Sequence, residues 1–155
     1  MNSGFKAPGG SSARTFVMVV NNGSAGWLMG YGYTVSCGSR FFVPFDEGTG
    51  YLGIARSCSN DVSTATSTTE AKIIVITYDG SVLKMFENNT EVLSVNTTLS
   101  TNALSSIKLG SDHYGSGNHF TGQIAEFLAY DSSLNTTDRQ AVQTYLATKF
   151  GITLN

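Results

Sequence analysis

Apolar and polar residues alternate in short runs along most of this chain, a pattern with the two-residue period of β-strands. The clearest run is residues 72–78, where four consecutive β-branched apolar residues predict a central strand that is covered on both faces. Turn residues follow at Asp79-Gly80 and at Asn88-Asn89, on either side of the apolar run 82–87. Residues 72–95 are therefore predicted to form a three-stranded antiparallel meander.

Further strands are predicted wherever the same alternation returns between turn residues. A turn is expected at Asn21-Asn22-Gly23, which ends a β-branched run, and a long surface loop is expected at the Ser- and Thr-rich residues 57–69. In the last strand, Glu126 shares one face with apolar neighbours, and Phe127 lies on the other face. These strands are predicted at residues 15–20, 27–35, 40–45, 51–56, 106–110 and 120–130.

A helical period occurs near the C-terminal end. Asn135 or Thr136 is expected to cap this helix, Asp138 lies in its first turn, and Gly151 ends it after the basic Lys149. Roughly eight or nine antiparallel strands with one terminal helix predict an all-β fold, a β-sandwich in which the helix covers a sheet. The apolar stripe predicted to face that sheet consists of Ala141, Val142, Tyr145, Leu146 and Phe150.

Composition narrows the class of protein. The chain has 155 residues, the length of one domain, and only 13% of them are charged, about half of the usual share. A net charge of −2 offers no basic patch for nucleic acid, and no apolar run approaches the ~18–20 residues that span a bilayer. Residues 1–12 are expected to be a flexible leader or an added end, and residues 13–155 a single domain from a larger protein. Cys37 and Cys58 either form a disulfide or remain two reduced thiols.

Four segments of the chain resemble, in the same order, the motifs of concanavalin A-like and laminin-G-like jelly-roll domains. The Tyr-Asp-Gly-Ser turn at 78–81 resembles their central hairpin, and Ile-Lys-Leu-Gly-Ser at 107–111 resembles a later strand. Residues 120–131 resemble their closing strand, and residues 134–151 the terminal helix of bacterial, phage and large-virus members. The usual Trp-His before the hairpin is replaced by Glu70-Ala71-Lys72. The resemblance implies an antiparallel two-sheet jelly-roll β-sandwich with one C-terminal α-helix.

Members of this family recognise glycans on the curved sheet or at its rim, and aromatic rings suit the C–H faces of sugars. Trp27, Tyr31 and Tyr33 are spaced to share one face of a strand, and interleaved glycines favour an open groove. Tyr51 is expected to join them from a neighbouring strand. The alternative is that these rings are buried in the core.

A second candidate is the Gly-rich loop that holds both histidines of the chain. Polar groups concentrated on one loop are typical of a site positioned by a rigid scaffold. Its candidate residues are Asp112, His113, Tyr114, Asn118 and His119. The spacing of the histidines and the aspartate matches no known metal motif, so no metal site is predicted there. The alternative is a solvated turn.

Two enzymatic interpretations stay open beside glycan binding. Glycoside hydrolysis needs a pair of carboxylates, and Glu126 is the candidate for a raised pKa, the alternative being a structural carboxylate. β-Elimination on a uronate polymer needs a group that neutralises the uronate, together with a base and an acid. The candidates for these roles are Arg40 or Arg56 for the cation and His113, His119 or Tyr114 for proton transfer.

The leading hypothesis is a module that recognises a cell-wall or cell-surface polysaccharide, within a larger secreted, cell-surface or virion-associated protein. The alternatives are a polysaccharide lyase or glycoside hydrolase, and a structural or adhesion module, because this fold hosts all of them. The expected partners are a glycan and other domains of the parent protein, with no nucleic acid and no membrane span. No cofactor is expected, apart from a calcium ion that Asp46, Asp61 and Asp112 would bind.

Overall fold

The computed structural model describes residues 7–32, 38–46, 51–54, 62–65, 70–102, 106–111 and 119–155. Only the backbone is described at 22–24, 42, 44–46, 51–54 and 63–65. Several predicted side chains lie outside the described residues, and the expectations for them stay predictions. They are Tyr33, Cys37, Asp46, Tyr51, Arg56, Cys58, Asp61, Asp112, His113, Tyr114 and Asn118.

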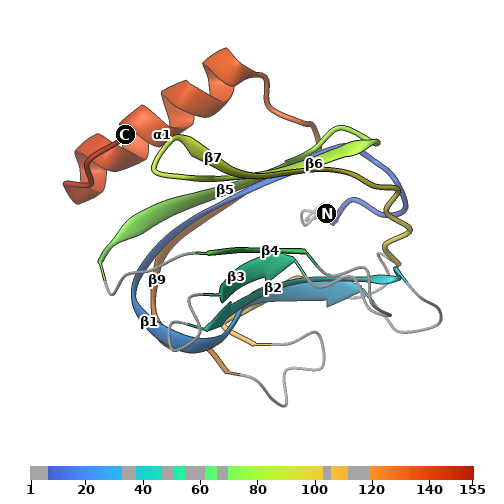
Figure 1. Ribbon diagram of the computed structural model, residues 1–155, viewed down its shortest axis with the longest axis horizontal. Coiled ribbons are helices and arrows are strands. Elements are labelled where there is room, and N and C mark those ends of the chain that lie inside the picture. Colours follow the sequence, from blue (N-terminus) through green and yellow to red (C-terminus); the bar gives the residue numbers. More distant parts are fainter. Residues whose placement is uncertain are drawn as a thin grey trace, which may run out of the picture. The chain divides into compact units, whose positions relative to one another are not determined.

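The described chain is mainly β-structure and ends in a helix, as Figure 1 shows. Residue contacts divide it into two compact units: unit 1 is Met1–Ser11, Ser24–Ser67 and Leu99–Thr121, and unit 2 is Ser12–Gly23, Thr68–Thr98 and Gly122–Asn155. The predicted fold class, antiparallel all-β with a C-terminal α-helix, is confirmed. The elements are β1 (Arg14–Gly32), β2 (Arg40–Asp46), β3 (Tyr51–Ile54), β4 (Val62–Ala65), β5 (Lys72–Tyr78), β6 (Val82–Glu87), β7 (Thr90–Asn96), β8 (Lys108–Leu109), β9 (Thr121–Tyr130) and α1 (Thr136–Phe150).

β1 is longer than predicted and continues through the expected turn at Asn21-Asn22-Gly23. The strand pairs with β5 along residues 14–20 and with β2 along residues 25–32. The polar residues therefore mark the point where one strand changes partners, and the turn prediction is wrong. The side chain of Asn21 donates a hydrogen bond of 3.4 Å to Gln123 of β9, so this polar position is used within the sheet.

β4 lies inside the segment predicted as a long surface loop, residues 57–69. Its residues pair with β3 in an antiparallel ladder from Ile54↔Val62 to Tyr51↔Ala65. A ladder supplies partners for backbone N–H and C=O groups, and Val and Thr fit a pleated surface, so the polar composition does not prevent a strand here. The loop prediction is wrong for residues 62–65.

In unit 1 the strand order is β8–β1–β2–β3–β4. β1 contains a bulge or register irregularity between Trp27 and Met29, where the partner strand advances by only one residue. Such an extra residue breaks the strict alternation of side chains between the two faces of a strand. The buried apolar side chains of this part of the chain include Leu28, Met29, Tyr31, Phe41 and Val43.

In unit 2 the strand order is β9–β1–β5–β6–β7, and the predicted meander of β5, β6 and β7 is confirmed. Every residue of β5 is buried, as its uninterrupted apolar run predicts. The β6–β7 turn contains Asn88 at φ 44° and Asn89 at φ 78°. Two successive residues with positive φ suit a tight hairpin turn, and Asn tolerates this conformation better than most residues.

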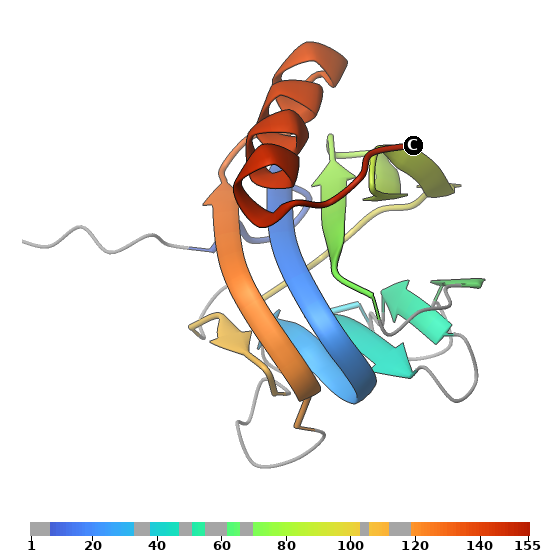
Figure 2. The same cartoon turned by 90° about the vertical axis from the view of Figure 1, so that its left-hand side faces the viewer.

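α1 begins after Asn135, whose side chain accepts a hydrogen bond of 2.9 Å from the backbone N–H of Asp138. It ends at Gly151, whose N–H donates to the carbonyl of Ala147, so the predicted caps are confirmed. Figure 2 shows the helix lying along β9 and β1. The core beneath it joins apolar side chains from β1, β5, β6 and α1: Val17, Val19, Ile73, Val75, Phe86, Leu146 and Ala147.

The buried face of α1 differs from the predicted apolar stripe. Ala141 is exposed, and Tyr145 is 58% exposed. Arg139 and Gln143, one turn apart, are buried instead. The Arg139 guanidinium lies over the Phe86 ring and donates a hydrogen bond to the Gln143 side chain. These contacts compensate in part for burying polar atoms, since Nε2 of Gln143 has no hydrogen-bond partner among the described residues. A pattern of apolar positions does not reveal them.

Candidate functional site

Trp27 and His119 lie side by side in unit 1, where their backbones form a parallel bridge. The N–H of Gly110 donates to the carbonyl of Leu28 at 3.0 Å, and the N–H of Phe120 donates to the carbonyl of Gly110 at 2.9 Å. The described residues that flank 112–118, Gly110 on one side and His119 and Phe120 on the other, therefore lie close together beside β1. We call this place the Trp27–His119 junction. Its residues flank, in the sequence, the segment 112–118 that holds the other candidate residues.

The side chains at the junction differ in exposure. Trp27 is half-buried and His119 is exposed. On the adjacent strand β8, Leu109 is 46% exposed although its backbone pairs with Met29. Backbone pairing thus places residues that carry an indole, an imidazole and an aliphatic side chain along residues 27–29 of β1 and on the segments beside them. Such a set offers apolar surface for packing and ring nitrogens for hydrogen bonds.

Tyr31 does not belong to this surface. Its side chain is fully buried, its hydroxyl donates a hydrogen bond of 3.1 Å to the carbonyl of Pro8, and its ring centroid lies 5.7 Å from that of Phe41. The expectation that Tyr31 and Trp27 share one face assumes strict alternation, and the irregularity at residues 27–29 removes that condition. Tyr31 is a core residue, and its assignment to a ligand-binding face is wrong.

The candidate catalytic residues with described side chains are distributed over both units. Arg40, half-buried, pairs through its backbone with Gly32 in unit 1. Glu126 lies in unit 2, where it accepts a hydrogen bond of 2.7 Å from the ammonium of Lys149. This hydrogen bond raises the pKa of Lys149 above its ordinary value. Glu126 is thus part of an ion pair between β9 and α1, a charged partner that the apolar neighbours along its own strand do not reveal.

Two further observations concern a metal site and a membrane-spanning helix. The described residues contain no group of three or more His, Cys, Asp or Glu residues that could hold a metal ion. Among the helices of these same ranges, none is long and apolar enough to cross a membrane.

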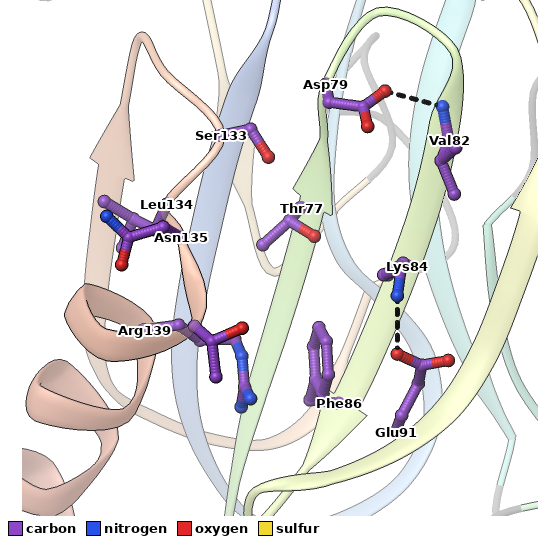
Figure 3. A pocket seen from close by; sticks show the side chains of 11 residues that line it. Thr77, Asp79, Val82, Lys84, Phe86, Glu91, Ser133, Leu134, Asn135 and Arg139 are labelled. Carbon is purple, nitrogen blue, oxygen red and sulfur yellow. Dashed lines mark hydrogen bonds and ion pairs between the residues drawn. The ribbon is translucent and has the colours of Figure 1, made fainter.

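Unit 2 contains a second feature, a pocket of about 260 Å³ between the start of α1 and the strands β5 and β6 (Figure 3). We call it the Arg139 pocket. Strand residues line one side of it, and the β9–α1 connection with the first turn of α1 lines the other. The lining includes Thr77, Lys84, Phe86, Glu91, Ser133 and Arg139.

Arg139 is the most buried charged residue of this pocket, at 7% exposure. Its guanidinium carbon lies 3.8 Å from the centroid of the Phe86 ring, and one of its nitrogens donates to the side chains of Asn89, at 2.9 Å, and Gln143. Burial lowers the pKa of Arg139 from its ordinary value, and the negative charge of Glu91 acts in the opposite direction. The group nevertheless remains a cation at neutral pH because an arginine starts from so high a pKa.

The other charges of the pocket are already matched. Lys84 donates a hydrogen bond of 2.9 Å to Glu91 on the neighbouring strand. One carboxylate oxygen of Asp79 accepts from the backbone N–H groups of Ser81 and Val82 and from the Ser81 hydroxyl. Arg139 has only neutral hydrogen-bond partners and no carboxylate at ion-pair distance among the described residues.

The sequence pattern does not indicate this pocket. Arg139 is one of few arginines, but it lies on a helix at a position where a charged residue is normally solvated. Its spacing is the one indication in the sequence. Arg139 precedes Val142 by three residues, Gln143 by four and Leu146 by seven, which places it on the helix face that packs against the sheet.

Asp79 provides a pH-dependent prediction. The backbone N–H groups of Val82 and Ser81 hold the pKa of Asp79 below its ordinary value of 3.8. A lowered folded-state pKa means that the ionised carboxylate stabilises the fold above pH ~4, and that this contribution is lost as the pH falls through the folded-state pKa. Asp79→Ala is expected to lower the free energy of unfolding by about 0.5–1 kcal/mol at pH 7, a small effect because the group is exposed.

The measurement is urea unfolding of both proteins between pH 7 and pH 2. The difference is expected to stay constant above about pH 5 and to shrink below pH ~4. Asp79→Asn is the matched control, because it keeps an acceptor for the same donors and removes the titration. A difference that grows on acidification would contradict the assigned role.

The chain is similar to known proteins in structure but not in sequence. No family model and no curated protein sequence match the chain. A CBM40 domain of Ruminococcus gnavus IT-sialidase bound to α2,3-sialyllactose has a TM-score of 0.68 and 14% identity, over 85% of this chain and 82% of that one. Domain 4 of the extracellular arabinanase AbnA from Geobacillus stearothermophilus, in complex with arabinotriose, has a TM-score of 0.63 and 15% identity, over 89% of this chain and 69% of that one.

A third similar structure is a whole enzyme. The NanB sialidase from Streptococcus pneumoniae has a TM-score of 0.63 and 20% identity over 86% of this chain, which spans only 24% of the sialidase. At these identities the likeness shows the fold alone. The chain therefore has the β-sandwich fold of these domains, in agreement with the strand order of each unit.

Proposed function

We propose that this chain is a carbohydrate-binding module that recognises a cell-wall or cell-surface polysaccharide at the Trp27–His119 junction. The carrying observation is the backbone bridge between Trp27 and His119, which places an indole beside the base of the histidine-containing loop. Sugars present C–H faces that pack on aromatic rings and hydroxyls that need hydrogen-bond partners of fixed geometry.

The fold supports the same proposal. Domains of this fold bind sialyllactose in a Ruminococcus gnavus sialidase and arabinotriose in a Geobacillus arabinanase. Both belong to enzymes that act on glycans, and the arabinanase is extracellular. We accordingly place the chain outside the cell or on its surface, as one part of a longer protein. The resemblance of its hairpin and closing strand to concanavalin A-like domains agrees with that function.

Within the proposed site, Trp27 supplies the ring on which a sugar packs and His119 a hydrogen-bonding imidazole. Asp112, His113, Tyr114 and Asn118 lie in the sequence between two described segments that both flank the junction, so they are proposed to contact further hydroxyls. Tyr33 and Tyr51 are proposed as additional rings. Backbone hydrogen bonds of the flanking residues Gly110 and Phe120 support such a placement.

Trp27→Ala and His119→Ala test the proposal. The wild-type domain is expected to bind at least one polysaccharide on a glycan array. Trp27→Ala is expected to lower that affinity about tenfold or more, which corresponds to a loss of ~1.4 kcal/mol of binding free energy. Affinities are measured by calorimetry with the glycan found on the array. Tyr145→Ala is the control, because this tyrosine is exposed on α1 in unit 2. Unchanged binding by both junction variants would overturn the site, and an array without any bound glycan would overturn the function.

A further inference from the structure

The Arg139 pocket contains a buried cation that forms no ion pair with any described residue. Arg139 is 7% exposed, and the described residues place neither Glu nor Asp at ion-pair distance from it. A buried charge is stable when it is paired and fully hydrogen-bonded, and here the pairing comes only from the neutral Asn89 and Gln143. An anion that enters the pocket would supply the negatively charged partner that the described residues do not give Arg139.

The guanidinium is held in one orientation. Its plane is fixed by the Phe86 ring at 3.8 Å, and both of its hydrogen bonds run through a single terminal nitrogen, Nη1. The remaining N–H groups are not used by any described residue. A planar fork held in this way is matched to a carboxylate, which accepts two parallel hydrogen bonds.

The rest of the lining suits a polyhydroxylated ligand. Thr77, Ser133 and Thr136 contribute hydroxyl groups to the lining. The Lys84–Glu91 pair adds a donor and an acceptor at the strand side, visible in Figure 3. A simple inorganic anion does not need these additional groups, whereas a sugar ring uses them for its hydroxyls. The volume of about 260 Å³ is close to the lower end of ligand pockets and fits one sugar residue better than a chain of several.

We propose that the Arg139 pocket is a second binding site, which takes the carboxylate of an acidic sugar residue, a uronate or a sialate. The carboxylate binds to the free edge of the Arg139 guanidinium, and the ring hydroxyls bind to the hydroxyl groups of the lining. This site lies in unit 2, whereas the Trp27–His119 junction lies in unit 1. The identification of the ligand as a sugar rests on the proposed function, and the anionic preference rests on Arg139 alone.

The experiment is an NMR titration of the full chain with methyl glucuronide and with the methyl glycoside of N-acetylneuraminic acid. Methyl glucoside and inorganic phosphate are the comparison ligands. At least one acidic sugar is expected to bind, with shifts at the Arg139 and Ser133 signals, and methyl glucoside is expected not to bind. Whichever acid binds more tightly identifies the source of the carboxylate. Phosphate binding as tight as that of both sugars, or no binding of either acid, would overturn the proposal.

Variants separate this site from the junction. Arg139→Lys keeps the charge and loses the fork, and is expected to weaken binding of the acidic sugar at least tenfold. Ser133→Tyr fills the pocket without changing Arg139, so it keeps the proposal testable if Arg139→Lys unfolds. Trp27→Ala is expected to leave this binding unchanged. If Trp27→Ala abolishes binding of the acidic sugar while Ser133→Tyr preserves it, the pocket proposal is wrong and the junction proposal stands.

Discussion

Gly26→Ala is expected to lower the free energy of unfolding by about 3 kcal/mol and to abolish glycan binding at the Trp27–His119 junction. Gly26 has a φ of 108°, and a Cβ placed there would lie 2.1 Å from the carbonyl oxygen of His119 and 2.6 Å from the Cα of Phe120. These contacts are with backbone, so no side chain can rotate away. The chain can relieve them only by separating residues 119–120 from β1.

The expected loss combines two effects. A side chain at positive φ costs ~1–2 kcal/mol, and separating the strands weakens backbone hydrogen bonds that contribute ~1 kcal/mol each. For a chain of this length, the melting temperature should fall by about 6–12 °C. Calorimetric melting measures the stability, and titration with the array-identified glycan measures binding. Because the clash is at the base of the loop, binding should fail even where the fold survives.

Gly110→Ala is the matched control for this prediction. Gly110 also has a positive φ, 69°, and lies in the same hydrogen-bonded loop base, but a Cβ there meets nothing within 4 Å. The expected cost is therefore the conformational strain of ~1 kcal/mol, with glycan binding retained. If Gly26→Ala behaves like Gly110→Ala in both measurements, the close approach of β1 and His119 does not hold the junction together.

Local patterns are sufficient for the parts of this fold whose neighbours lie nearby in sequence. β5 is predicted correctly because a strand buried on both faces is apolar throughout. The hairpin turn at Asn88-Asn89 and the caps of α1 are likewise determined by a few adjacent residues. In each case the physical cause lies within the segment that the pattern covers.

The wrong predictions occur where a residue's structure depends on a partner that is distant in the sequence. The polar residues 21–23 stay within a strand because β1 passes from β5 to β2, and neither partner adjoins them in sequence. Tyr31 is a core residue because residues 28–32 are all buried, and the irregularity at 27–29 breaks the alternation that would place it on one face with Trp27. Pairing overrides local composition at these positions.

The same distinction applies to the candidate site. Tryptophan, histidines and a Gly-rich loop are visible in the sequence, so the components of the junction can be predicted. The contact between these components cannot be predicted, because Trp27 and His119 are far apart in the chain. Their backbone bridge depends on the close approach at Gly26. The Arg139 pocket is less accessible still, since a buried arginine has the same pattern as a solvated one until Phe86 and Asn89 are placed against it.

Leu146→Ala is expected to cost about 3 kcal/mol of stability, within the range of ~2–5 kcal/mol found for buried leucines. Leu146 is fully buried in the core that joins α1 to β1 and β5, where Val17, Ile73 and Val75 are its companions. Removing its branched end leaves a cavity that an α-helix anchored at both ends by caps cannot readily close. Urea unfolding monitored by circular dichroism measures the change in midpoint.

Tyr145→Ala is the companion variant, and it distinguishes the observed helix face from the one expected from apolar spacing alone. That spacing places Tyr145 and Leu146 on the same buried stripe, so it predicts large losses for both. In the structure Tyr145 is 58% exposed, and its replacement should change stability by no more than about 0.5 kcal/mol. Equal losses for the two variants would mean that α1 is rotated about its axis relative to the arrangement that buries Arg139, and the Arg139 pocket would then lose its principal residue.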